Sequence, residues 1–250
     1  WFVRKIGYFL SIFLGTSASE SVAAAGNIFL GGIESALLVK PFIDEMTESE
    51  LHAIMTGGFA TIASSLFAVY SGFGIDPVAI LSASIMSAPA ALAMSKLAYP
   101  ETEESKTGLG KKGNFHIPKS DGVNVVHAAS NGAYIGMQLL LNITANIIAA
   151  LAILAMLDAW LLYLGAKVDI HLSFTVICEI LFYPFAWLMG VDAEDCRQVA
   201  AVLGLKVFAN EFVAYDSLAS TYRDQISARS FNIASYALCG FSNFGGVGIM

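Results

Sequence analysis

Four long stretches of this chain contain no Asp, Glu, Lys or Arg, and this pattern limits what the chain can fold into. They cover residues 53–75, 77–95, 122–157 and 230–250. A helix needs roughly 20 mostly apolar residues to cross a hydrocarbon core about 30 Å thick. Charged residues make up 13% of the chain, whereas soluble domains carry about 25%. We therefore expect an all-α, polytopic membrane protein rather than a soluble protein with buried helices.

The rest of the composition argues against several functions. The net charge of −7 is unlike that of nucleic-acid-binding proteins, which need clustered Lys and Arg. The three cysteines are widely separated and form no metal-ligand spacing. There is no convincing Ser/Lys or paired-Asp arrangement, so an enzyme is not expected. The chain begins at Trp1 and ends inside an apolar run, and we expect it to be part of a longer protein.

Glycine, asparagine and acidic residues interrupt some apolar segments and leave others continuous. We expect an interfacial helix at 1–14, re-entrant hairpins at 17–42 and 172–217, broken transmembrane helices at 53–73 and 230–250, spans at 77–97 and 133–164, and a polar loop at 99–121. By the positive-inside rule, the lysines of this loop lead us to expect it on the cytoplasmic side. Each half of a hairpin is too short to cross a membrane alone. Interrupted segments in two halves of a chain indicate the binding site of a transporter.

Two glutamates, Glu34 and Glu211, lie in apolar surroundings. An ionisable residue at the centre of a span costs about 2.5–3.5 kcal/mol on insertion scales, so such residues usually serve a function. A carboxylate accepts two hydrogen bonds at once, which suits the vicinal hydroxyls of a ribose, and it can instead take up a coupling proton. The alternatives are a position nearer the interface or a structural pair with Lys40 or Lys206.

Two asparagines, Asn27 and Asn243, lie at the expected breaks. Unwound backbone frees carbonyl oxygens that coordinate Na⁺. An asparagine that caps a half-helix explains each position equally well, so both interpretations stay open here.

One segment carries a specific motif. Residues 204–215 read GLKVFANEFVAY. At every fixed position they match the signature G-x-K-x-x-x-N-E-F-V-A-Y, and here the chain resembles the concentrative nucleoside transporters. ESV at 20–22, GNIF at 26–29, SAPA at 87–90 and CGF at 239–241 resemble further stretches of that family in the same order. The resemblance runs essentially from end to end.

This resemblance implies a nucleoside symporter that is coupled to Na⁺, sometimes to H⁺. It further implies a multi-pass protein of the plasma membrane that forms a homotrimer and moves its substrate by an elevator motion. The residues that match substrate-binding positions of the family are Glu211 and Asn243 on the ribose, Phe241 in the pocket wall, and Leu66 on the base. Those that match its Na⁺ ligands are Asn27, Thr61 and the carbonyls of Leu30 and Ile62.

The chain departs from the family pattern at its substrate positions. The first hairpin usually reads G-Q-T-E, whereas this chain has Gly31, Gly32, Ile33 and Glu34. Gly246 replaces a serine that helps to bind ribose. A site that hydrogen-bonds its ligand discriminates through polar groups that the wrong ligand leaves unpaired. We therefore expect altered base selectivity. The alternative is a membrane protein that binds a nucleoside as a sensor without transporting it.

Overall fold

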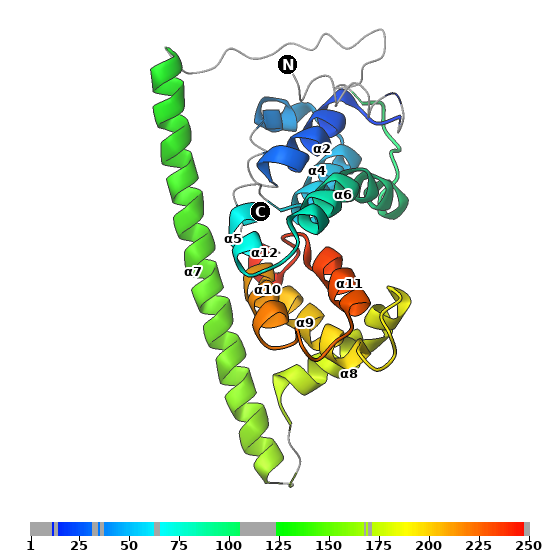
Figure 1. Cartoon of the computed structure of the whole chain (residues 1–250). Coiled ribbons are helices and arrows are strands. Elements are labelled where there is room, and N and C mark those ends of the chain that lie inside the picture. Colours follow the sequence, from blue (N-terminus) through cyan, green and yellow to red (C-terminus); the bar gives the residue numbers. More distant parts are fainter. Residues whose placement is uncertain are drawn as a thin grey trace. The chain divides into compact units, whose positions relative to one another are not determined.

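The computed structural model describes residues 12, 15–31, 35, 38–62, 66–105, 124–167, 169 and 172–247. Within these residues all regular secondary structure is helical, as predicted (Figure 1). The elements are α2 (Ala18–Leu30), η1 (Lys40–Glu45), α4 (Glu48–Ala60), α5 (Phe67–Gly72), α6 (Pro77–Ala98), α7 (Val125–Ala166), α8 (Phe174–Leu188), α9 (Cys196–Phe208), α10 (Glu211–Ser220), α11 (Ala228–Leu238) and α12 (Phe244–Val247). Of the predicted helix 1–14 the structure describes only Ile12, and of the predicted loop 99–121 only residues 99–105; the rest of both lies outside the described residues.

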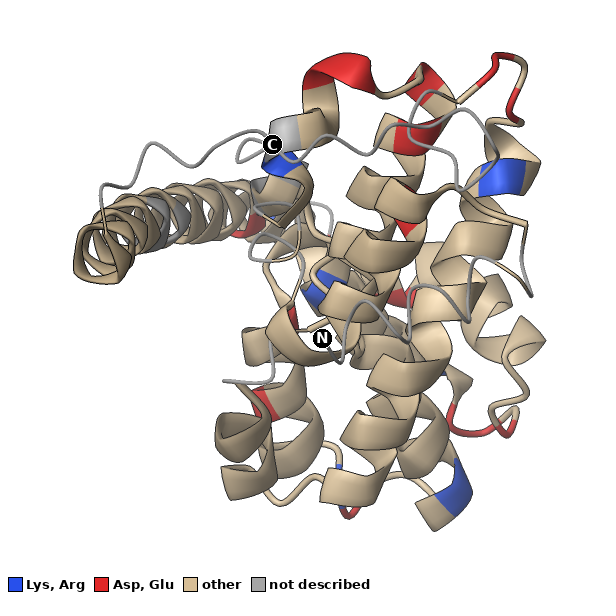
Figure 2. Ribbon diagram, turned by 90° about the horizontal axis from the view of Figure 1, so that it is seen from above, with Lys and Arg blue, Asp and Glu red and all other residues tan. Residues whose placement is uncertain are grey.

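The chain divides into two compact units. One consists of Trp1–Pro118 with Cys239–Phe241, and the other of Lys119–Leu238 with Ser242–Met250. Most of the described ribbon is formed by residues other than Lys, Arg, Asp and Glu (Figure 2), in keeping with the composition.

In the first unit, α2 packs against α4 and α6. Both α2 and α4 begin with a capping box. The hydroxyl of Ser17 or Thr47 accepts from the backbone N–H of the glutamate three residues later, and the carboxylate of that glutamate accepts from the backbone N–H of the Ser or Thr. A capping box satisfies two backbone N–H groups that the helix itself leaves without partners. Small side chains then allow close packing between the helices, as Ala24 and Ala53 do against Leu92.

After α2 the chain turns back on itself. Gly31 ends α2 with a φ of 87°, a backbone conformation that glycine adopts without strain. The returning residues Ser35 and Leu38 then pack on Gly26, where an added Cβ would lie 2.8 Å from Leu38 Cδ1. The glycine at this position therefore permits the close approach of the two arms.

In the second unit, α9 is the central helix and contacts α8, α10 and α11. Its last residue, Phe208, stacks on Phe244 with ring centroids 5.1 Å apart and meets Phe174 edge to face at 4.8 Å. The region predicted as one hairpin at 172–217 holds three helices, α8, α9 and α10. Helical structure is interrupted at 189–195, between α8 and α9, and again at Ala209 and Asn210, between α9 and α10. Glu211 follows the second interruption.

Two helical segments are long and apolar enough to cross a membrane, namely α6 and Thr144–Ala166 of α7. They overlap the segments expected as spans, 77–97 and 133–164. The helix α7 has 42 residues, which at 1.5 Å per residue is about 63 Å, and Figure 1 shows it as one continuous rod. Within Thr144–Ala166, the 18-residue window that qualifies as a span has no buried residue.

Candidate functional site

Glu211 is the first residue of α10, and the segment around it fixes its position. Asn210 precedes it as the N-cap, and the Oδ1 atom of Asn210 accepts a hydrogen bond of 2.8 Å from the backbone of Val213. The Glu211 side chain is 3% exposed. A helix N-terminus carries a partial positive charge that stabilises a nearby carboxylate. The signature asparagine and glutamate thus form a capped helix start with a buried acid.

Asn243 lies beside this acid in the same unit. Its Nδ2 atom donates to Oε2 of Glu211 at 3.3 Å, while its Oδ1 atom accepts from the backbone of Gly246 at 2.7 Å. The second contact is that of an N-cap at the start of α12. Both interpretations of Asn243 are therefore compatible, because the oxygen caps the helix and the nitrogen faces Glu211.

The Glu211–Asn243 pair has a definite chemical capacity. A carboxylate offers about four acceptor sites, and a side-chain amide nitrogen carries two N–H donors. Adjacent hydroxyls on a sugar each donate one hydrogen bond and accept others. The hydroxyls of a diol can therefore donate to the Glu211 carboxylate and accept from the Asn243 amide at the same site.

Two further side chains from the signature segment contact the end of α11. The Lys206 Nζ atom donates to the Ala237 carbonyl, and the Tyr215 hydroxyl donates to the Ser235 carbonyl, each at 2.8 Å. Sequence reasoning considered Lys206 only as a possible partner of Glu211 and did not single out Tyr215. The available signal was a lysine within an apolar helix turn.

Asn27 of α2 and Thr61, the C-cap residue of α4, both lie beside Gly57 of α4 in the first unit. Asn27 is 1% exposed, and its Oδ1 atom accepts from the hydroxyl of Ser35. A Cβ on Gly57 would lie 2.8 Å from the Asn27 Nδ2 atom. The Thr61 hydroxyl donates to the Gly57 carbonyl at 3.0 Å. The structure therefore brings these two predicted ligands to the same glycine.

The expected carbonyl ligands belong to the ends of the same helices. Leu30 is the last residue of α2, and Ile62 follows the C-cap residue of α4. The final carbonyls of a helix lack intrahelical partners and carry a partial negative charge, so both ends suit a cation. Among the described residues no three His, Cys, Asp or Glu side chains gather in a metal-binding cluster. Amide, hydroxyl and carbonyl oxygens suit hard cations rather than transition metals.

Of the remaining predicted site residues, the structure describes some and not others. Leu66 and Phe241 are both half-buried in the first unit. Beside Phe241, the backbone at Gly240 has a φ of 129°, and a Cβ there would lie 3.0 Å from two carbonyl oxygens at the end of α4. Gly32, Ile33 and Glu34 lie outside the described residues.

Known proteins resemble the chain along its whole length. Residues 79–250 match the family described as Na⁺ dependent nucleoside transporter C-terminus, and residues 1–76 match the one described as nucleoside recognition. Sodium/nucleoside cotransporter 2 of Mus musculus is 46% identical and sodium/nucleoside cotransporter 1 of Homo sapiens is 45% identical, each over 100% of this chain and 40% of the relative.

A solved structure of CNTnw, in an inward-facing substrate-bound state, is 36% identical with a TM-score of 0.83. The similarity covers 99% of this chain and 58% of that one. This chain spans about two fifths of the length of the curated relatives. The family match over more than half of the residues, with relatives this similar from end to end, shows that the chain belongs to the Na⁺-dependent nucleoside transporter family.

Proposed function

We propose that the full-length protein carries nucleosides across the plasma membrane together with Na⁺. The observation that carries this proposal is the buried Glu211 carboxylate in hydrogen-bonding contact with Asn243 at 3.3 Å. Burying a carboxylate is costly unless it is hydrogen-bonded, so a buried acid beside a helix break indicates a ligand site. The names of the relatives, sodium/nucleoside cotransporters, supply the ligand class.

The ribose of the nucleoside is the part that this pair recognises. Asn243 donates to Glu211. A diol that enters the site donates to the carboxylate and accepts from the amide, so it replaces one internal hydrogen bond by several. Hydrogen bonds to an ionised carboxylate are about twice as strong as neutral ones, which favours this exchange.

The Na⁺ ion binds, in this proposal, at the ends of α2 and α4. Asn27 and Thr61 supply side-chain oxygens, and Leu30 and Ile62 supply carbonyl oxygens. The contacts of Asn27 and Thr61 around Gly57 support this assignment, because they hold both side chains against the same helix end. The alternative coupling ion is H⁺, taken up by an acidic residue.

The base is bound more permissively than the ribose. Phe241 and Leu66 offer apolar surface, whereas Gly32, Ile33 and Gly246 lack the polar side chains expected at these positions, with Glu34 retained. The backbone of Gly246 already donates to Asn243, so its contribution is to hold the asparagine. We accordingly propose uptake of both purine and pyrimidine nucleosides.

The full-length protein works, we propose, as a homotrimer with elevator-type movement. Unburied apolar surface along α7 supports a covering partner or lipid in this region. The molar mass of the purified protein in detergent, measured by light scattering, distinguishes a trimer from a monomer.

The decisive experiment measures uptake of labelled uridine and adenosine by cells that express the full-length protein. We expect uptake of both with Na⁺ and little without it. Glu211→Gln should abolish uptake at normal surface expression because the amide places a donor where the ribose needs an acceptor. Glu194→Gln, at an exposed residue before α9, is the matched control and should transport normally.

Two results would contradict this proposal. Uptake that ignores Na⁺, or that persists in Glu211→Gln, removes the coupling or the ribose role. Nucleoside binding without uptake by the wild-type protein supports the sensor alternative.

A further inference from the structure

The C-terminal end of α11 is held by two side chains from other helices. A helix leaves its last four carbonyls without intrahelical partners, and in α11 these belong to residues 235–238. Lys206 donates to the carbonyl of Ala237, and Tyr215 donates to that of Ser235, both at 2.8 Å. These two side chains therefore satisfy acceptors that the break after Leu238 would otherwise leave open.

Both side chains are buried, which makes these contacts costly to arrange. Lys206 is 8% exposed and Tyr215 is fully buried. Lysine is almost never fully buried unless it is paired, because removing its charge from water costs free energy. The negative end of the α11 dipole favours the ammonium group. This lysine is thus placed where a helix end compensates for its burial.

The two anchors lie on either side of the proposed ribose acid in the sequence. Lys206 is in the last turn of α9, Glu211 begins α10, and Tyr215 lies one turn further along α10. Five residues after α11 ends, the chain reaches Asn243, which donates to Glu211. One short segment therefore holds Glu211 directly and holds Asn243 through the end of α11.

We propose that Lys206 and Tyr215 are positioning residues that hold the C-terminal end of α11 so that Asn243 stays within reach of Glu211 and of the ribose. This inference rests on the proposed nucleoside site. Neither residue touches the substrate in this account. Each acts through the backbone of α11.

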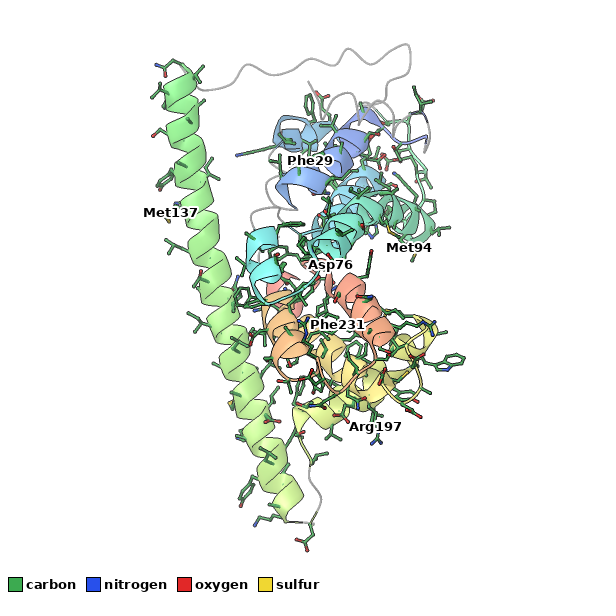
Figure 3. The ribbon with its side chains drawn as sticks, in the orientation of Figure 1. Phe29, Asp76, Met94, Met137, Arg197 and Phe231 are labelled. Carbon is green, nitrogen blue, oxygen red and sulfur yellow. The ribbon has the colours of Figure 1, made fainter. Side chains whose placement is uncertain are left out.

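The opposite end of α11 has independent anchors. Asp195 accepts from the backbone and the hydroxyl of Ser227 at 3.0 and 2.8 Å, just before the helix begins. The Arg223 guanidinium lies 5.4 Å from the ring centroid of Phe231, which Figure 3 labels on α11. Loss of Lys206 or Tyr215 should therefore loosen only the end of α11 that leads to Asn243, without unfolding the helix.

The test uses purified full-length protein and equilibrium binding of uridine, 2′-deoxyuridine and 3′-deoxyuridine. Tyr215→Phe removes one hydroxyl at constant shape, and Lys206→Met removes the ammonium while keeping the apolar stem. We expect each to weaken uridine binding about tenfold, equivalent to about 1.4 kcal/mol, and to weaken binding of at least one deoxy analogue much less. Discrimination between ribose and deoxyribose should therefore fall.

Three further variants test whether the loss of affinity arises from the hydrogen bonds to α11 and acts through Asn243. Tyr236→Phe alters an exposed tyrosine on the same helix and should bind like wild type. Lys206→Gln retains a neutral N–H donor and should recover part of the lost affinity, whereas an effect of charge alone predicts no recovery. Asn243→Ala combined with Tyr215→Phe should be no weaker than Asn243→Ala alone, because both changes disturb the same contact.

Each result has a defined meaning. If Tyr215→Phe and Lys206→Met melt at lower temperature but keep the wild-type preference for ribose, their role is only structural and the inference is wrong. If the wild type binds uridine but does not transport it, the transport proposal fails while the positioning inference is still tested by binding. If the wild type binds no nucleoside, both fail.

Discussion

At the scale of single residues, the buried acid Glu20 depends on one lysine. Glu20 is 2% exposed at the start of α2, and its Oε2 atom accepts from the Ser17 backbone. Its other oxygen pairs with the ammonium group of Lys96, from the last turn of α6. Lys96 also donates to Ser49 at 2.8 Å. This contact joins the N-terminal ends of α2 and α4 to the C-terminal end of α6.

We expect Lys96→Met to destabilise the full-length protein. Removing one partner of a buried ion pair costs roughly 3–5 kcal/mol, and the one-quarter exposure of Lys96 places this case at the lower end. Thermal unfolding in detergent measures the loss. Glu20→Gln combined with Lys96→Met should restore much of the stability, since the unpaired buried charge of Glu20 is then removed as well. Arg197→Met, at an exposed residue labelled in Figure 3, is the control. A double variant less stable than Lys96→Met would argue against the pair.

A second prediction at this scale concerns Thr61. Thr61→Val removes the hydroxyl that donates to Gly57 and that we propose as a Na⁺ ligand, while Thr61→Ser retains it. We expect the Na⁺ concentration for half-maximal uptake to rise several-fold in the valine variant and to stay near the wild-type value in the serine variant. Equal Na⁺ dependence in all three proteins would exclude Thr61 as a ligand.

The sequence alone pointed to Glu211 and Asn243 of the candidate site but not to the contacts of Lys206 and Tyr215. Glu211 and Asn243 were recognisable because a charge in an apolar run and an asparagine at a break are visible in the sequence, and the structure joins them. The contacts of Lys206 and Tyr215 end on backbone carbonyls. Every residue has such a carbonyl, so the sequence carries no sign of which one is the partner.

At the scale of elements, the sequence indicated most interruptions through glycine. Gly31 and Gly240 both have positive φ values at chain breaks. The interruption at Ala209 and Asn210 contains no glycine or proline, and the apolar pattern continues across it. Only the capping role of Asn210 marks it, which is why α9 and α10 were predicted as one arm of a hairpin.

The contact between α8 and α9 depends on a glycine at position 204. A Cβ there would lie 2.3 Å from the Cβ of Cys178 and 2.5 Å from its Sγ atom. We expect Gly204→Ala to destabilise the full-length protein by about 3 kcal/mol, the upper end of what overpacking typically costs, and so to lower its thermal midpoint. Adding Cys178→Ala should rescue little because the Cβ remains. Adding Cys178→Gly should rescue more.

A matched control lies in α7. Gly136 has no atom within 4 Å of an added Cβ, and alanine favours a helix over glycine by about 1 kcal/mol. Gly136→Ala should therefore not lower the midpoint. If Gly204→Ala melts like wild type, the two helices can separate without cost and the close contact is not needed for stability.

At the scale of the whole molecule, α7 differs from every other described helix. It is about 63 Å long by its 42 residues, roughly twice the hydrocarbon thickness of a bilayer. Large apolar side chains are exposed along it, among them Met137 in Figure 3, Ile153 and Trp160. A helix exposed to water would not keep such a surface. Lipid, another copy of the chain or the rest of the full-length protein therefore covers its apolar part.

We expect a lysine in this part of α7 to impair membrane insertion. Ile153 lies near the middle of Thr144–Ala166 and is 55% exposed, and a lysine at the centre of a span costs about 2.5–3.5 kcal/mol on insertion scales. Ile153→Lys should reduce the fraction of full-length protein that resists alkaline extraction from membranes. Val126→Lys, on the same helix but before this window and 78% exposed, should leave extraction unchanged. Equal resistance of both variants would mean that 144–166 does not cross the hydrocarbon core, because only a position within that core makes the two lysines unequal.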